Sequence, residues 1–210
     1  MSTRIEEILD YLNNELLDFS NYGCYVLLAI ARPKVNPQFT HKKAPVFRQI
    51  VFQKEDLLRK YKKLLRELPK EMNFYTYITI NPRNYKKAWF NLQQEIAKIN
   101  WGIINGDSGS EQRIKRVDKL WHSELQNKRN KNKSLFLFDL DSEDYDVFLH
   151  FSAELSRQTD IVVDSKTKNG WHIVCEPFNP NLFQHGSFVD GEGTVELKKD
   201  ALLFVDYVEN

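Results

Sequence analysis

The stretch that most constrains this chain is residues 135–141, which reads Leu-Phe-Leu-Phe-Asp-Leu-Asp. Four apolar residues in a row are typical of a strand buried on both faces. Side chains two residues apart project to the same side of a strand, so we expect Asp139 and Asp141 to lie together. Two carboxylates this close repel each other unless a cation or a shared proton relieves the repulsion. Oxygen ligands suit Mg²⁺ or Mn²⁺, but a strand that ends in a solvated Asp-x-Asp explains the pattern equally well.

Length and composition set the broad class. A chain of 210 residues forms one large or two small domains, and its 14 Phe, 9 Tyr and 4 Trp provide material for a core. The net charge of +1 does not by itself indicate a nucleic-acid partner. Cys24 and Cys175 both sit in apolar runs, which indicates a reducing compartment rather than a disulfide framework or a cysteine zinc site. Without a signal peptide or a membrane-spanning run, we expect a soluble, cytoplasmic protein.

Hydrophobic periodicity predicts alternating helices and strands in the first half of the chain. The expected elements are a helix over 4–17, strands over 24–31 and 46–52, a helix over 54–68 and a strand over 74–80. After the last strand, Asn81 is expected to cap a helix that has Pro82 in its first position. We therefore expect an N-terminal α/β module over residues 1–106.

A basic segment separates this module from the second half. Residues 107–133 hold eight basic and four acidic side chains and include a modest amphipathic helix. After the strand that opens the second half, Ser142 is expected to cap a helix. The Asn169-Gly170 turn predicts a hairpin, and short strands are expected over 161–163, 171–175, 194–197 and 202–208. The division is thus 1–106, 107–133 and 134–210, within one composite domain.

A histidine beside a basic turn is the second candidate feature. Lys166, Lys168 and Asn169 precede His172, and exposed amides and lysines at a turn can hold phosphate oxygens. A histidine next to them can bond the same group. A core or surface histidine beside a solvated turn is the alternative.

An acidic residue in an apolar strand is the third candidate feature. Asp206 stands in the run Leu-Phe-Val-Asp-Tyr, and a buried carboxylate requires a cation, a donor or water. Asp200 is a competing acid closer to the start of that strand. For either residue alone, a solvated edge position accounts for the sequence.

The order of these features resembles the archaeo-eukaryotic primase superfamily, the primase-polymerases. Its motifs are hydrophobic-Asp-x-Asp/Glu, small-x-His and hydrophobic-Asp, which here match residues 138–141, 170–172 and 205–206. These three stretches are also similar to stretches in the polymerase domains of bacterial end-joining ligases. The sequence Tyr-Ile-Thr-Ile-Asn-Pro-Arg at 77–83 is similar to an element of phage and plasmid members of the superfamily. Gly170 replaces the usual Ser of the second motif, and the zinc-binding cysteines of many members are absent.

The resemblance implies an α+β fold, with an RRM-like antiparallel or mixed catalytic sheet and flanking helices fused to the N-terminal module. It also implies a metal-dependent nucleotidyltransferase that extends a nucleic-acid chain on a DNA template by two-metal catalysis. Its substrates would be nucleoside triphosphates, and a replicative helicase is a further candidate partner. The metal ligands for Mg²⁺ or Mn²⁺ would be Asp139, Asp141 and Asp206, with Asp200 as the alternate third acid. The residues that would bind the nucleotide are Lys166, Lys168, Asn169 and His172. The residues that would bind the template are Arg83, Lys128, Arg129 and Lys131.

Three other classes of protein share parts of this pattern. A metal-dependent nuclease or replication-initiation protein also uses clustered acids and a histidine, although rolling-circle initiators carry a His-x-His pair that is missing here. A haloacid-dehalogenase-like phosphatase has Thr or Val two residues after the second Asp, where this chain has Glu143. A catalytically inactive relative that only binds nucleic acid is the third alternative.

Overall fold

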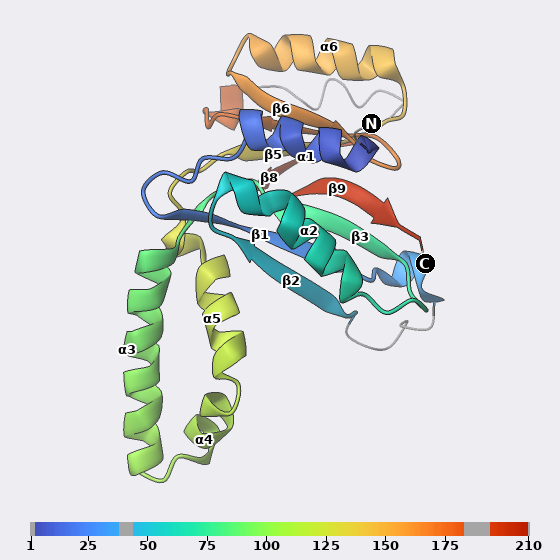
Figure 1. Ribbon diagram of the computed structural model, residues 1–210. Helices are drawn as coiled ribbons and strands as arrows, with labels where there is room; N and C mark the ends of the chain where they lie inside the picture. Colours follow the sequence, from blue (N-terminus) through green and yellow to red (C-terminus); the bar gives the residue numbers. More distant parts are fainter. Residues whose placement is uncertain (1–2, 38–43, 183–193, 210) are drawn as a thin grey trace.

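The fold consists of two antiparallel sheets, helices packed on them and a projecting arm of three helices (Figure 1). The structure is a computed structural model and describes residues 3–37, 44–182 and 194–209. Helices and strands are segregated rather than alternating in parallel units, so the expected α+β class is confirmed.

The first sheet is assembled from both ends of the chain. Its strand order is β2-β1-β3-β9, with the short β4 also paired to β1. The strands are β1 (Gly23–Ile30), β2 (Val46–Val51), β3 (Phe74–Thr79), β4 (Arg83–Asn84) and β9 (Leu202–Val208). Because β9 pairs with β3, the last strand of the chain belongs to the N-terminal sheet. The segment expected as the second half, 134–210, therefore contributes strands to both sheets.

The second sheet carries the strand on which the sequence prediction centred. Its order is β6-β7-β5-β8, formed by β5 (Phe136–Asp141), β6 (Ile161–Lys166), β7 (Trp171–Cys175) and β8 (Thr194–Lys199). Helix α6 (Tyr145–Ser156) covers one face, where its Phe151 packs on Phe138 with ring centroids 5.3 Å apart. The opposite face contributes Leu137 and Val174 to the main core.

The main core lies between the two sheets and two helices. Helices α1 (Arg4–Glu15) and α2 (Leu57–Arg66) place Leu12 and Tyr61 against the first sheet, where both are almost fully buried. Each fully buried side chain of this size stabilises the fold by about 1.5–3 kcal/mol before its entropy cost. Alternation along β5 puts Leu137 into this core and leaves Asp139 farther along the same face.

A helical arm projects from the sheets (Figure 1). It consists of α3 (Tyr85–Ile104), α4 (Ser108–Ile114) and α5 (Val117–Gln126). Gly102 lets α4 fold back on α3, because a Cβ there would lie 2.2 Å from Ser110 Oγ. Short 3-10 turns complete the described elements: η1 (Pro33–Val35), η3 (Lys54–Asp56), η4 (Lys128–Asn130) and η5 (Pro180–Leu182).

Two predicted helix caps are wrong. Asn84, not Asn81, caps α3 by accepting from Lys87 N–H at 2.9 Å. Asn81 Oδ1 instead accepts from the Leu135 N–H at 2.7 Å. Likewise Asp144, not Ser142, caps α6. In both places a short extended segment precedes the helix, and sequence pattern locates helix ends less well than helix centres.

No helix in the described ranges combines the length and the apolar character needed to cross a bilayer.

Candidate active site

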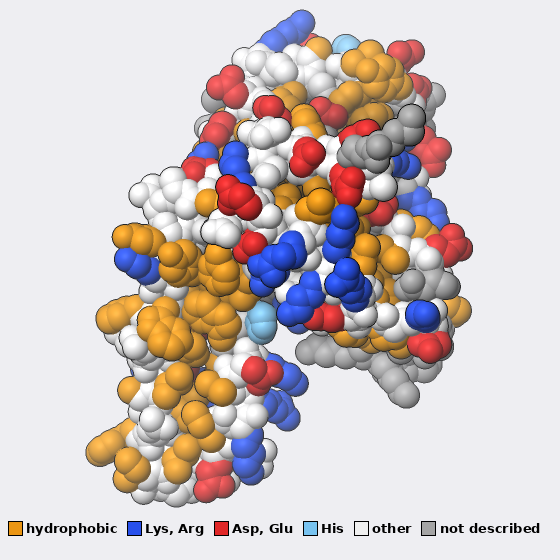
Figure 2. Space-filling model, in the orientation of Figure 1, with side chains coloured by type: hydrophobic (Ala, Val, Ile, Leu, Met, Phe, Trp, Pro, Cys, Tyr) orange, Lys and Arg blue, Asp and Glu red, His pale blue; other side chains and the backbone are white. Residues whose placement is uncertain are grey.

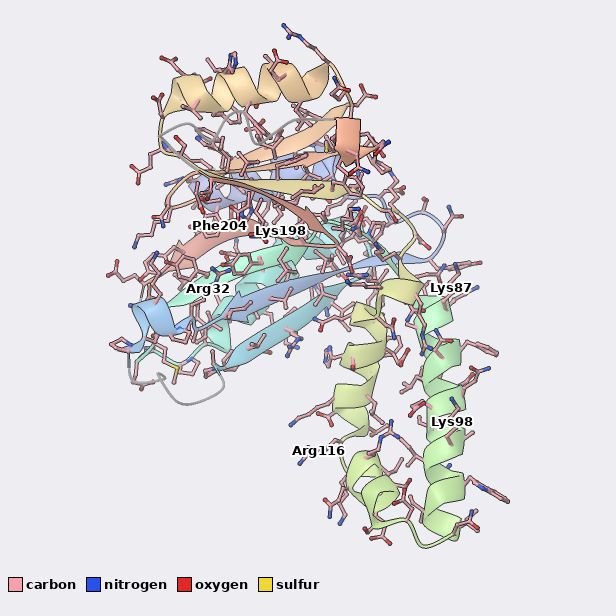
Figure 3. All side chains as sticks on the ribbon, turned by 180° about the vertical axis from the view of Figure 1, so that it is seen from behind. Arg32, Lys87, Lys98, Arg116, Lys198 and Phe204 are labelled. Carbon is pink, nitrogen blue, oxygen red and sulfur yellow. The ribbon has the colours of Figure 1, made fainter. Side chains whose placement is uncertain are left out.

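A cavity of about 590 Å³ opens where the two sheets meet. Its polar wall is the acid–histidine cluster on the second sheet: Asp139, Asp141, His172, Glu196 and Lys198. Its aromatic wall is Tyr75, Tyr77 and Phe204 of the first sheet. Figure 3 shows Lys198, Phe204 and Arg32 close together at this junction, each from a different segment of the chain.

Strand register brings the polar wall together. Asp139 on β5 lies directly opposite His172 on β7 and directly opposite Glu196 on β8. Residues opposite each other in antiparallel strands share one face of the sheet. His172 Nε2 is 3.3 Å from Asp139 Oδ1, and the Lys198 ammonium contacts the other carboxylate oxygen. Lys198 Nζ also lies 3.1 Å from Glu196 Oε2.

His172 joins the two sheets. The backbone N–H of Phe204 on β9 donates to His172 Nδ1 at 3.1 Å. Because Nδ1 accepts this bond, the proton of a neutral imidazole lies on Nε2, which then donates to Asp139. The ring is 8% exposed, so its two bonds are well shielded from water. His172 is thus held in one orientation with its N–H directed at the carboxylate.

The ionisation of Asp139 reflects these contacts. Burial raises the pKa of the carboxyl group, but hydrogen bonds from His172 and Lys198 outweigh burial and lower the pKa to about 2. For Lys198, burial lowers the ammonium pKa, and the contacts with Asp139 and Glu196 more than reverse this, so its pKa is raised. The cluster therefore already contains a cation bound to Asp139.

The aromatic wall presents flat rings across the cavity from these charges. The Arg32 guanidinium lies 5.1 Å from the Tyr77 ring centroid and 5.5 Å from that of Tyr75. Burial raises the pKa of Tyr77 to about 12, so its hydroxyl stays protonated at neutral pH. Further cations, Lys34, Lys168 and Lys199, also line the cavity.

The turn before β7 lies beside this cluster. Lys168 and Asn169 line the cavity, as expected, and Lys168 also lines an adjoining cavity. Lys166 lines only the adjoining cavity, and its Nζ lies 5.5 Å from the Trp171 ring centroid. A Cβ on Gly170 would lie 1.9 Å from the Leu140 carbonyl oxygen. No side chain therefore fits at position 170, which accounts for the glycine there.

Asp206 lies apart from the other predicted metal ligands. The β3–β9 register shifts by one residue, from Thr76 opposite Asp206 to Tyr77 opposite Phe204. The shift turns Asp206 toward Tyr61 of α2, whose hydroxyl it influences, while Phe204 faces the cavity. Asp206 instead lines the adjoining cavity of about 720 Å³ with Lys166, and Lys168 and Phe204 line both cavities.

Glu196 is the acid that sequence reasoning missed. Together with Asp139 and Asp141 it completes three carboxylates on one face of the second sheet. The Val195-Glu196 pair has the same hydrophobic-acid pattern as Val205-Asp206 and lies in a strand that the sequence predicted. The two pairs differ in their strand partners, because β8 pairs with β5 whereas β9 pairs with β3.

Asp200, the alternate third acid, forms a buried ion pair with Arg83. Arg83 Nη2 lies 2.7 Å from Asp200 Oδ1, with side chains 4% and 5% exposed. Asp200 also adopts a left-handed backbone conformation, with φ of 69°, in the turn between β8 and β9. Arg83 therefore has no exposed guanidinium to offer to template phosphate, although Asp200 lines the cavity.

The remaining predicted template residues lie at the base of the arm. Arg129 is ion-paired to Glu124 at 2.7 Å, Lys131 forms a β-bridge with Arg83, and Lys128 is exposed. None of the three lines the cavity.

A divalent cation fits the chemistry of the donor set but not its present arrangement. Among the described residues, no three His, Cys, Asp or Glu side chains lie close enough together to hold a metal ion. Asp139, Asp141 and Glu196 nevertheless share one face, and oxygen ligands of this kind suit Mg²⁺ or Mn²⁺. The Lys198 ammonium occupies the second oxygen of Asp139, so a metal ion would have to displace it.

Comparisons of the chain with protein-family models, with curated proteins and with solved structures found no match.

Proposed function

We propose that this cavity binds a nucleoside triphosphate, and that the protein is a metal-dependent nucleotidyltransferase of the primase-polymerase type acting on a DNA template. The observation that carries the proposal is the convergence of three separate segments in one cavity. Asp139 and Asp141 come from β5, Lys168 to His172 from the turn and start of β7, and Glu196 from β8. The first two segments match the expected motifs. The third supplies a further acid, Glu196, on the same face of the second sheet as Asp139.

The topology of the second sheet supports an RRM-like catalytic half. The chain runs β5, α6, β6, β7 and then β8, and the strand order is β6-β7-β5-β8. This order and the single helix crossing between β5 and β6 are compatible with the ferredoxin-like arrangement to which RRM sheets belong.

The charge distribution suits a triphosphate. Arg32, Lys34, Lys168 and Lys199 line the cavity around the acid–histidine cluster, and can neutralise phosphate oxygens. His172 lines the same space, and its Nε2–H holds the Asp139 carboxylate in place. Across the cavity, the aromatic wall offers a face on which a base can stack.

A bound divalent cation would supply Lewis-acid charge for phosphoryl transfer. The residues that would hold it are Asp139, Asp141 and Glu196. The protein's own groups position the phosphates and neutralise their charge, which is most of what this class of reaction requires.

The test is incorporation of labelled nucleotides on primed and unprimed templates with Mg²⁺ or Mn²⁺. Wild-type protein is expected to incorporate label, and Asp139→Asn and Glu196→Gln to lose it by at least about 100-fold, with unchanged circular dichroism. Asp206→Asn is the matched control, because that residue lines the other cavity. Absence of incorporation under all conditions, or equal activity in Asp139→Asn, would refute the proposal.

A catalytically inactive nucleic-acid-binding relative is the second candidate. It is favoured by the Lys198 ammonium, which already satisfies Asp139 without a metal. Calorimetric titration with Mn²⁺ separates the two, since the inactive relative is expected to bind no metal. Divalent-dependent cutting of DNA or RNA without incorporation would identify the nuclease alternative instead.

A further inference from the structure

One face of α3 combines cations with exposed aromatic rings. Lys87, Phe90, Gln94, Lys98 and Trp101 follow each other at spacings of three or four residues, which places them on one side of the helix. We call this face the outer stripe. Phe90 is 59% exposed, Trp101 is 68% exposed and the Lys98 side chain is 76% exposed. Figure 2 shows hydrophobic side chains gathered over the arm.

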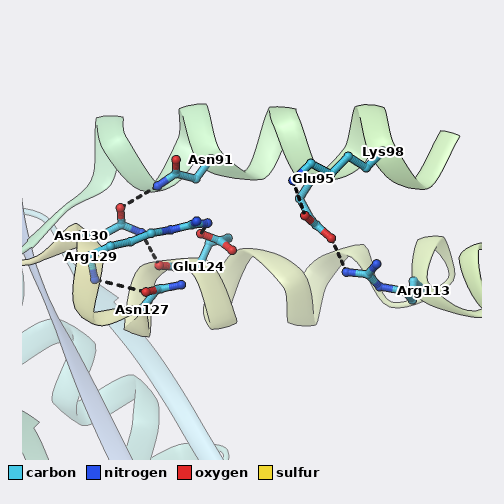
Figure 4. Close-up of polar contacts among 8 residues, drawn as sticks. All are labelled: Asn91, Glu95, Lys98, Arg113, Glu124, Asn127, Arg129 and Asn130. Atoms are coloured by element: carbon cyan, nitrogen blue, oxygen red, sulfur yellow. Dashed lines mark hydrogen bonds and ion pairs between the residues drawn. The ribbon is translucent and has the colours of Figure 1, made fainter. Parts of the chain in front are cut away.

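The base of the outer stripe continues into a shallow groove. Lys86, Lys87, Phe90, Asn91, Arg129 and Asn130 line a hollow of about 560 Å³. Asn91 Nδ2 donates to Asn130 Oδ1 at 2.8 Å, which holds the η4 turn against α3 (Figure 4). The groove lining contains three cations and no carboxylate. Arg129 is paired with Glu124, yet its side chain remains 55% exposed.

Few acids oppose these cations. Glu95 is the single acid within α3, and it is engaged by Arg113 of α4, with Lys98 Nζ 3.9 Å away (Figure 4). Its charge is therefore neutralised on the side of α3 that faces α4. The outer stripe and the groove together present net positive charge.

Exposed aromatic rings interleaved with cations match a particular kind of ligand. Large exposed apolar side chains that lie together commonly mark binding surfaces. A second copy of this chain fits poorly, because a two-fold interface would set one positively charged surface against another. A polymer that alternates flat bases with phosphates complements both groups, since bases stack on rings and phosphates pair with lysines.

We propose that the outer stripe and its groove bind single-stranded nucleic acid, with bases stacked on Phe90 and Trp101 and phosphates at Lys87 and Lys98. The two rings are separated by eleven residues, or about 16 Å along the helix, which several nucleotides can span. Figure 3 shows Lys87 and Lys98 on α3, away from the cavity residues Arg32, Lys198 and Phe204. The site is therefore distinct from the cavity and is testable without nucleotide transfer.

The experiment is fluorescence anisotropy of a labelled oligothymidylate with the full chain, in EDTA and without nucleotide. The double charge reversal Lys87→Glu/Lys98→Glu is expected to weaken binding on the order of tenfold. It should also flatten the salt dependence by about 1.4 in the log–log slope, at about 0.7 per phosphate contact. The double variant Phe90→Ala/Trp101→Ala is expected to weaken binding on the order of tenfold or more, with the salt slope unchanged.

Matched controls lie elsewhere on the surface. Arg66→Glu/Lys70→Glu changes two exposed cations at the end of α2 and just beyond it, and Tyr145→Ala/Leu149→Ala removes exposed apolar side chains of α6. Both controls are expected to bind the oligonucleotide like wild type. Asp139→Asn should do so too, which separates failure of this site from failure of the cavity.

Three results would overturn the proposal. The first is no binding by wild-type protein at low salt, and the second is equal affinity of all variants. The third is a concentration-dependent dimer that Phe90→Ala/Trp101→Ala abolishes in sedimentation, together with unchanged oligonucleotide affinity. That last result would assign the outer stripe to contact between copies of the chain.

Discussion

Asp139 is the residue on which the candidate site depends most. Its two oxygens contact two different cationic or N–H donors, one from each neighbouring strand. A carboxylate 21% exposed at the side chain is shielded enough for these contacts to influence folding.

The depressed pKa of Asp139 links stability to pH. Because the folded pKa is about 2 and the ordinary value is 3.8, the contribution is present above pH 3.8 and is lost as the pH falls toward 2. Asp139→Asn is expected to unfold more easily at neutral pH, by up to about 2 kcal/mol, with the difference from wild type vanishing near pH 2. Urea denaturation across this range measures it, with exposed Asp10→Asn as the control. A difference that stayed constant with pH would contradict the prediction.

Lys198 is expected to compete with any divalent cation for Asp139. Lys198→Met removes the ammonium without removing the aliphatic chain, and should tighten Mn²⁺ binding on the order of tenfold if about 1.4 kcal/mol of competition is removed. Calorimetric titration measures this affinity. Lys70→Met changes an exposed lysine that does not line the cavity, and serves as the control. Unchanged or weaker Mn²⁺ binding in Lys198→Met would show that the ammonium does not occupy the cation position.

The geometry of the candidate site depends on the close approach between the start of β7 and the end of β5. The chain reaches this position through the turn that ends at Gly170, and Leu140 pairs with Trp171 in the next register position. A backbone approach this tight excludes any side chain.

Gly170→Ala should therefore separate these two strands. The added Cβ would lie 1.9 Å from the Leu140 carbonyl oxygen, a backbone atom that cannot move without shifting β5. We expect a loss of about 1–3 kcal/mol in the free energy of unfolding, as for overpacked sites, measured by urea denaturation. Gly109→Ala is the control, because its nearest neighbour is the flexible end of Asp107 at 3.2 Å. Equal stability of Gly170→Ala and wild type would mean that the turn relaxes at no cost.

At the scale of the whole molecule, β9 connects the two sheets. It supplies Leu203 and Val205 to the main core, forms the edge partner of β3, and donates the Phe204 N–H that orients His172. The candidate cavity exists because the chain leaves the second sheet after β8 and returns to the first.

A chain that ends at Asp200 is accordingly expected to lose cooperative folding. It would expose the β3 edge and remove two buried side chains worth about 1.5–3 kcal/mol each, which is a large share of a typical domain stability. Thermal unfolding followed by circular dichroism tests this. A chain ending at Val208 keeps the whole of β9 and provides the control. A sharp transition in the shorter chain would show that the sheets fold without β9.

Features that depend only on neighbouring residues could be predicted from the amino-acid sequence. The apolar run before Asp139 predicted β5, the Asn169-Gly170 turn predicted the β6–β7 hairpin, and the patterns at 194–197 and 202–208 predicted β8 and β9. Periodicity and turn chemistry act within a few residues, so one sequence suffices to read them.

Which acid lies on the same face as Asp139 and Asp141 depends on long-range strand pairing and could not be predicted from the sequence. Val195-Glu196 and Val205-Asp206 look alike in sequence, but β8 pairs with β5 whereas β9 pairs with β3. A one-residue register shift between β3 and β9 then places Asp206 on the face of the first sheet that packs against Tyr61 of α2. Strand partners and register are set by burial and hydrogen bonding between distant segments, which no local pattern encodes. Long-range contact likewise buried Arg83 against Asp200.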